Sequence, residues 1–250
     1  MNDYIITLDV DWASDYVIDY VADKLVRSKV RATWFITHDS PSIRSLFRYD
    51  DLFEIGLHPN FMDGSTQGDS PARVMEHLKN IYPLAESVRT HGLFQSSPLL
   101  KQLVDEFGVK YDSSLFLPYT KNIEPHGMYY RGSGELIRLP YFWSDYTEAN
   151  HPSRDFSFAN PKYHMEGMKV FNFHPVHVAL NTEDVRRYDE LRASVRISAC
   201  KKADIDRFRN RSAKGAENVF DALLDKLKDG ILNSKTIAGT ANEWKKQRMA

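Results

Sequence analysis

Short apolar runs alternate with amphipathic stretches along most of the chain. Residues 4–10 form an apolar run with β-branched side chains, which predicts a strand that is buried on both faces. Most of the apolar runs are followed by a helical pattern, and this order is typical of a mainly parallel sheet with helices outside it. We expect further strands at residues 31–37, 53–58, 87–91, 109–112, 135–142 and 169–174.

Capping residues and helical spacing mark the helices. Ser14 precedes a pattern that predicts a helix to about residue 28. Serine–proline pairs predict three more helix starts, because proline fits the first helical turn. These pairs lie at residues 40–41, 70–71 and 97–98; the second helix is expected to end near residue 86 and the third at Gly108, and residues 217–228 predict another amphipathic helix.

The order of elements leaves two architectures open, an open doubly wound sheet and a closed barrel. No change in composition marks a boundary, so we expect one domain over residues 1–250. Residues 118–134 and 150–168 carry no clear pattern, and we expect them to be long loops of the kind that often serve function.

The composition excludes several classes of protein. Hydrophobic residues make up 42% of the 250 residues, which is too many for a disordered chain. The 33 Lys and Arg nearly balance the 34 Asp and Glu, so we expect no nucleic-acid partner. Cys200 is the single cysteine, which rules out an internal disulfide and a cysteine-based zinc cluster. Apolar runs are too short to span a bilayer and signal-peptide features are lacking, so we expect a cytoplasmic protein of open oligomeric state.

Ionisable side chains gather where four of the predicted strands end. Functional sites in parallel α/β folds lie at the carboxyl ends of the strands. Oxygen and imidazole ligands without a thiolate suit Zn²⁺ or another first-row divalent ion. The pattern therefore predicts a metal-assisted site, with structural histidines and helix-capping aspartates as the alternative. The residues concerned are Asp9 and Asp11, His58, Arg89 and His91, and His174.

Five segments resemble, in the right order, the motifs of the polysaccharide deacetylase superfamily, of the NodB-homology or carbohydrate esterase 4 type. They are ITLDVDWA, FEIGLHPN, VRTHG, ELIRLPYFWSDY and FNFHP, and the resemblance covers about residues 4–180. It implies a distorted (β/α)7-type barrel of mostly parallel strands with outer helices. It also implies that Asp9 is the catalytic base, that Arg89 orients this base, and that His174 is the general acid.

The same resemblance implies one divalent metal ion, with Zn²⁺ expected first and Co²⁺, Mn²⁺ or Ni²⁺ as alternatives. By the motif match, Asp11 and His58 are two of its ligands. The family usually has a second histidine about four residues after the first, but Met62 stands there and does not suit a hard site. We expect His91 as the third ligand because strand spacing points it the same way as Arg89. Asp63 is the alternative.

The implied activity is hydrolysis of an acyl group, expected to be N-acetyl, from an amino sugar or surface-polysaccharide precursor. The alternatives are another non-peptide C–N amide hydrolase of the superfamily and an inactive, deacetylase-like carbohydrate-binding protein. We expect Trp143 to stack on a sugar and His177 to line the pocket, with plain packing and a loop position as the alternatives. Residues 182–214 carry 10 Lys and Arg against 6 Asp and Glu. This excess of basic residues predicts either a solvated helical face or a surface that binds a nucleotide or lipid diphosphate.

Overall fold

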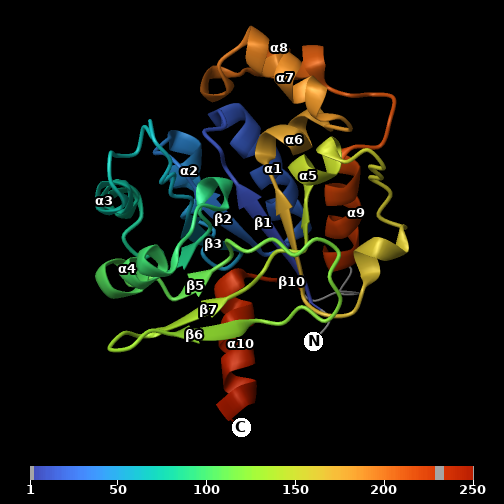
Figure 1. The fold of residues 1–250 in the computed structure, drawn as a ribbon. Helices are drawn as coiled ribbons and strands as arrows, with labels where there is room; N and C mark the ends of the chain where they lie inside the picture. Colours follow the sequence, from blue (N-terminus) through green and yellow to red (C-terminus); the bar gives the residue numbers. More distant parts are fainter. Residues whose placement is uncertain (1–2, 229–233, 250) are drawn as a thin grey trace.

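The computed structural model describes residues 3–228 and 234–249. Its strands form one sheet in the order β6-β7-β5-β4-β3-β2-β1-β9-β8, and β10 pairs with β1 (Figure 1). Neighbouring strands are parallel, except that β6 and β7 are antiparallel. The sheet curls around its core and the helices surround it, which confirms the expected distorted (β/α)7-type barrel.

The described strands are β1 (Tyr4–Asp9), β2 (Ala32–Ile36), β3 (Phe53–Leu57), β4 (Ser87–Val88), β5 (Tyr111–Asp112), β6 (His126–Tyr129), β7 (Glu135–Arg138), β8 (Trp143–Ser144), β9 (Lys169–Phe173) and β10 (Ser234–Lys235). The described α-helices are α1 (Asp15–Ser28), α2 (Pro41–Leu46), α3 (Pro71–Ile81), α4 (Ser97–Phe107), α5 (Asp145–Asn150), α6 (Pro175–Leu180), α7 (Val185–Ser194), α8 (Lys202–Phe208), α9 (Ala216–Lys228) and α10 (Ile237–Met249).

The centre of the sheet is the part that the apolar runs predicted best. All residues of β1 are buried, because β2 and β9 pair with its two edges, one face of the curled sheet points into the barrel interior, and helices cover the other face. Burial on both faces explains why these strands read as apolar runs rather than as alternating patterns. The carboxyl ends of β1, β3, β4 and β9 therefore meet at one end of the barrel.

The serine–proline helix starts are confirmed with small shifts. The Ser40 hydroxyl accepts a hydrogen bond from the Ile43 amide, which caps α2 as expected. The third of these caps is Ser96, one residue before the expected one, and its hydroxyl accepts from the Leu99 amide at 3.3 Å. Gly108 ends α4 with φ 64, a left-handed conformation that glycine adopts without strain. Helix α3 ends at Ile81, earlier than the expected end near residue 86.

Two expectations for the second half of the chain were wrong. Residues 118–134 are not all loop, because β6 lies within them and pairs with β7 as a hairpin. The run at 135–142 does not form one strand, because β7 ends at Arg138 and a separate strand, β8, begins at Trp143. Pro140 lies between the two and lacks the amide hydrogen that a continuing ladder needs.

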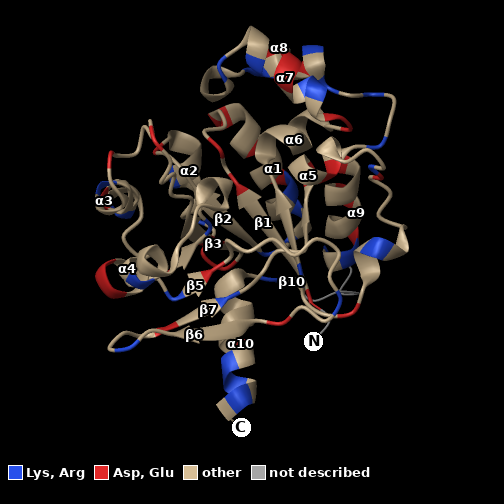
Figure 2. Cartoon of the chain, in the orientation of Figure 1, with Lys and Arg blue, Asp and Glu red and all other residues tan. Residues whose placement is uncertain are grey.

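Residues 182–214 contain α7 and α8, which lie above the end of the barrel where α6 begins (Figure 1). Figure 2 shows that acidic and basic residues are interspersed along this pair of helices. The site described below opens beneath α7. No helix within residues 3–228 and 234–249 has both the length and the apolar character that a bilayer span requires.

Candidate metal centre and active-site cleft

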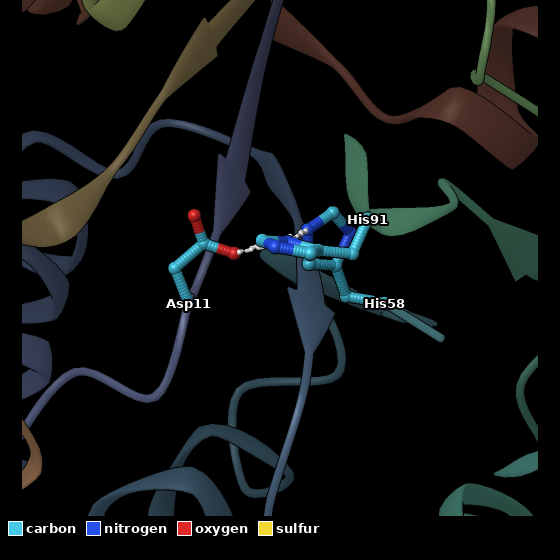
Figure 3. Close-up of side chains that lie close together, drawn as sticks. All are labelled: Asp11, His58 and His91. Atoms are coloured by element: carbon cyan, nitrogen blue, oxygen red, sulfur yellow. Dashed lines mark hydrogen bonds and ion pairs between the residues drawn. The ribbon is translucent and has the colours of Figure 1, made fainter. Parts of the chain in front are cut away.

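Three potential ligand atoms converge at the carboxyl ends of β1, β3 and β4 (Figure 3). The His58 Nε2 atom lies 3.1 Å from Asp11 Oδ1 and 3.3 Å from His91 Nδ1. The His91 Nδ1 atom is itself 3.1 Å from Asp11 Oδ1. Zinc ligands at ~2.0–2.1 Å in a tetrahedron would lie roughly 3.3 Å from one another, so the triangle has the dimensions of one face of such a site.

Hydrogen bonding orients His58 for this role. Its Nδ1–H donates to the Arg89 carbonyl oxygen at 2.6 Å, and a carbonyl oxygen can only accept. In the neutral ring, the Nε2 lone pair then faces the Asp11 carboxylate, which is also an acceptor. Two facing acceptors require a cation between them, either a proton or a metal ion. A backbone carbonyl behind the outer ring nitrogen is the usual support of a metal-bound histidine.

The electrostatics agree with a cation-binding site. Burial by itself would raise the pKa of Asp11, but hydrogen bonds from His58 and His91 hold it well below the usual range. Burial would lower the pKa of His58, and the charges of Asp9 and Asp11 overcome this and raise it. The pocket is thus organised around positive charge next to Asp11.

Asp9 and Arg89 lie one layer below this triangle. The Asp9 carboxylate accepts from Arg89 Nη1 at 2.9 Å and from Asn172 Nδ2 at 2.9 Å. The Arg89 side chain is fully buried, and its remaining hydrogen bonds go to Thr7, Asn172 and Ser113. Burial would raise the pKa of Asp9, but the guanidinium of Arg89 outweighs it and keeps the pKa low, so Asp9 is ionised at neutral pH.

His174 approaches the site from the other side, at the end of β9. Its Nδ1–H donates to Asp145 Oδ1 at 2.6 Å, and its Nε2 lies 3.6 Å from Asp11 Oδ2. Burial disfavours the imidazolium, but the Asp145 carboxylate outweighs it and raises the pKa of His174 to about 9. The ring is therefore protonated on both nitrogens at neutral pH, and its Nε2–H points into the cleft.

Asp145 is the residue that sequence reasoning missed. It is 1% exposed, opens α5 directly after β8, and also accepts from the His174 backbone amide at 2.7 Å. A carboxylate at the end of the ELIRLPYFWSDY segment carries the same strand-end signal that singled out Asp9 and Asp11.

A cleft of about 520 Å³ opens over these groups. It brings together the site residues predicted at the strand ends, although Arg89 lies beneath its floor. His177 also lines it, as expected, and burial lowers the pKa of this ring to about 4, so it is neutral. Tyr146 forms part of the wall and is 47% exposed, with its ring 5.8 Å from that of His177.

The expectation that Trp143 stacks on a sugar was wrong. Its side chain is 1% exposed, and its ring packs against Phe171 and Phe173 in the core, with centroids 5.6 and 5.1 Å away. No face is left for a ligand. Tyr146, three residues later, is an exposed aromatic residue that lines the cleft.

The reason given for the position of His91 also needs correction. Strand β4 ends at Val88, and His91 lies in a turn in which Gly92 has φ 60, so strand spacing does not set its direction. Asp11 likewise follows β1 in a left-handed conformation, with φ 45. The alternative ligand, Asp63, is exposed and lines a separate hollow with Asn60.

A family model described as WbmS-like polysaccharide deacetylase matches residues 6–192. Among solved structures, WbmS from Bordetella bronchiseptica, assigned as a polysaccharide deacetylase involved in O-antigen biosynthesis, is 29% identical. The alignment covers 90% of each chain with a TM-score of 0.79. No curated protein matches the chain.

Two more distant structures share the fold. The peptidoglycan deacetylase PdaC of Bacillus subtilis is 13% identical over 100% of this chain and 94% of its own, with a TM-score of 0.52. A polysaccharide deacetylase assigned in Mycobacterium smegmatis is 18% identical over 94% of this chain and 92% of its own, with a TM-score of 0.50. At these identities the likeness concerns the arrangement of the chain and not its activity.

Proposed function

Because the chain belongs to the WbmS-like polysaccharide deacetylase family, we propose that it is a metal-dependent hydrolase that removes an N-acetyl group from an amino sugar. The observation that carries the proposal is the triangle of Asp11, His58 and His91 beside the buried Asp9–Arg89 pair. Similarity to WbmS, a protein assigned to O-antigen biosynthesis, supports a surface-polysaccharide precursor as the substrate.

The triangle fits a metal ion in its spacing, in its donor atoms and in the hydrogen bond that orients His58. We propose Asp11, His58 and His91 as the ligands, with Zn²⁺ as the first candidate and Co²⁺, Mn²⁺ or Ni²⁺ as alternatives. Such an ion would polarise the amide carbonyl and make a water molecule more acidic. His91, which comes from another loop, would take the place of the family's second histidine.

Asp9 is the proposed general base. Its carboxylate is ionised and held by Arg89 and Asn172 below the triangle, so it can accept the proton of the attacking water. Arg89 touches Asp9 and lies beneath the cleft, so it acts as a positioning residue that keeps the base charged and oriented.

His174 is the proposed general acid. Its Nδ1–H is bound by Asp145, so the proton available to the leaving amine is the one on Nε2, which lies 3.6 Å from Asp11 Oδ2. Hydrolysis of the amide requires such an acid in addition to the base. His177 and Tyr146 would contact the sugar.

Acetate release from N-acetylated amino sugars tests the proposal, together with the metal content of the full-length protein. We expect about one equivalent of a divalent ion, loss of acetate release after chelation, and recovery when metal is returned. Acetate release that continues in the metal-free protein would contradict the proposal, and a metal-free, inactive protein that still binds sugar would favour the carbohydrate-binding alternative.

Two histidine variants sharpen this experiment. His58→Ala removes a proposed ligand at the rim of the barrel and should weaken metal binding by at least ~100-fold, more than the loss of an outer-shell partner. The control His77→Ala removes an exposed histidine of α3 and should bind metal like the wild type. Full occupancy of His58→Ala at limiting metal would show that His58 is not a ligand.

A further inference from the structure

Helix α7 forms a wall of the cleft that the proposed chemistry does not use. Tyr188, Asp189 and Arg192 of this helix line the same cleft as Asp11 and His174. Among the described residues around the cleft, Arg192 is the single lysine or arginine. The metal-side residues account for the hydrolysis of an amide, but they give no reason for a guanidinium at the opposite wall.

The Arg192 guanidinium is available to a ligand. Its side chain is 65% exposed, and its ion pair with Asp189 is long, with 3.9 Å between Nη2 and Oδ1. Asp189 is itself 56% exposed, and a pair so open to water holds its partners weakly. By contrast, Arg186 on the same helix lies 2.8 Å from Asp184 and does not line the cleft.

A row of ring contacts fixes where Arg192 lies relative to the reaction. Its guanidinium lies over the Tyr188 ring, 5.8 Å from the centroid. The Tyr188 ring packs against His177 at 4.9 Å, and His177 packs against His174 at 5.4 Å. A group bound at Arg192 is therefore separated from the proposed proton donor by two rings, so it belongs to a part of the substrate other than the amide being cleaved.

We propose that Arg192 binds an oxyanion of the substrate, a carboxylate or a phosphate, and so selects acidic amino sugars over neutral ones. The inference rests on the proposed function for the place of the cleaved amide. The planar fork of a guanidinium matches both kinds of oxyanion, and α7 presents it at the open side of the cleft. Asp189 competes with the substrate for Arg192 in the empty site.

The test compares kcat/KM for matched acidic and neutral substrates. The substrates are an N-acetylated hexosaminuronic acid, an N-acetylhexosamine 1-phosphate, and the neutral methyl glycoside of N-acetylhexosamine. Arg192→Gln should lower the acidic-to-neutral ratio of kcat/KM by about 10- to 100-fold, the usual worth of a hydrogen bond to a charged group. The acidic substrate with the larger drop identifies the oxyanion as carboxylate or phosphate.

Three further variants make the result specific. Arg192→Lys should retain part of the ratio, because it keeps the charge but loses the fork. Asp189→Asn should increase the ratio, because it removes the competing carboxylate. Arg186→Gln, the matched control on the same helix, should leave the ratio as in the wild type. An unchanged ratio in Arg192→Gln, or an equal drop in Arg186→Gln, would overturn the proposal.

A binding measurement separates this inference from the proposed function. Calorimetry on the metal-loaded Asp9→Asn protein reports affinity for the acidic sugars without turnover. Adding Arg192→Gln should weaken that binding by about 10-fold or more. If the wild type releases no acetate but this loss of affinity is seen, the deacetylase proposal fails and the oxyanion site stands. If the wild type releases acetate but Arg192→Gln does not change the affinity, the oxyanion site fails and the deacetylase proposal stands.

Discussion

The cleft has a floor, formed by Arg89 and Asp9, and a rim, formed by Asp11, His58 and His91. The two differ in where their polar groups find hydrogen-bond partners. On the floor, Arg89 is fully buried, and its nitrogens donate to protein oxygens, among them Asp9 Oδ1. At the rim, the ligand atoms of Asp11, His58 and His91 lie 3.1–3.3 Å from one another, and a proton or a metal ion must stand between the His58 ring and the Asp11 carboxylate. The floor is complete within the protein, whereas the rim is complete only with a cation.

Because of this difference, removing a floor residue and removing a rim residue should affect different properties of the protein. Removing a floor group leaves a buried charge without its partner, so the fold itself should suffer. Removing a rim group takes away one side of an incomplete site, so ligand binding should suffer more than stability. Each variant below is a way to break or to sharpen this contrast.

The largest effect is expected for Arg89→Met. The substitution leaves the Asp9 carboxylate buried without its guanidinium, so the free energy of unfolding should fall by about 3–5 kcal/mol. Urea unfolding of the metal-free protein measures this loss. Acetate release should also drop, because Asp9 would no longer be held ionised.

Arg44→Met is the control for this loss. Arg44 forms an exposed pair with Asp39, so its removal should leave the free energy of unfolding nearly unchanged. If Arg89→Met does not fold, the milder Arg89→Lys keeps the charge and still lacks the forked hydrogen bonds, so it should be destabilised to a smaller extent. Wild-type stability in both Arg89 variants would remove the distinction between floor and rim.

The next effect separates the two aspartates of ITLDVDWA. Asp9→Asn keeps the shape of the base but cannot accept a proton, so turnover should drop by ~10²–10⁴ and excess metal should not restore it. Asp11→Asn removes a proposed ligand, so its lost activity should be partly recovered by excess metal. Activity against metal concentration measures both.

Asp63→Asn is the matched control, because Asp63 is exposed and lies outside the cleft. It should respond to metal like the wild type. Metal rescue of Asp9→Asn with none for Asp11→Asn would mean that the two roles are reversed, and weakened metal binding in Asp63→Asn would reopen the choice of His91 as third ligand.

The smallest effect concerns Asp145, the hydrogen-bond partner of His174. His174 must be protonated to act as an acid, so activity should hold below its pKa of about 9 and fall as the pH rises through it. Asp145→Asn removes the charge that raises this pKa, so the alkaline limb of the pH–rate profile should move down by about 1–3 pH units. An alkaline limb that stays in place would exclude His174 as the titrating acid.

Local sequence patterns located the central strands and the candidate site residues, and the resemblance to the polysaccharide deacetylases implied the barrel. The apolar runs located β1, β2, β3 and β9 to within one residue at each end, because strands buried on both faces must be apolar throughout. Parallel strands place their carboxyl ends together, so residues that follow such runs could be expected to meet. Asp9, Asp11, His58, Arg89 and His174 could therefore be expected at one site from the sequence.

The tertiary structure decided how these side chains meet. Strand spacing was the wrong reason for His91, which reaches the triangle through a turn with positive φ at Gly92, and Asp11 reaches it with a positive φ of its own. Such a conformation costs a residue other than glycine roughly 1–2 kcal/mol, and surrounding contacts, not local preference, maintain it. No periodic pattern in the sequence predicts the positive φ at these two positions.

The sequence likewise did not predict which distant segments contact each other. The Asp145–His174 hydrogen bond joins residues from the start of α5 and the end of β9, and Arg192 reaches the cleft because α7 folds back over the barrel. The sequence by itself determined the central strands of the sheet and which chemistry collects at the strand ends, because these depend on the character of short segments. Partner, direction and exposure of each side chain were decided by packing, because they depend on segments far apart in the chain.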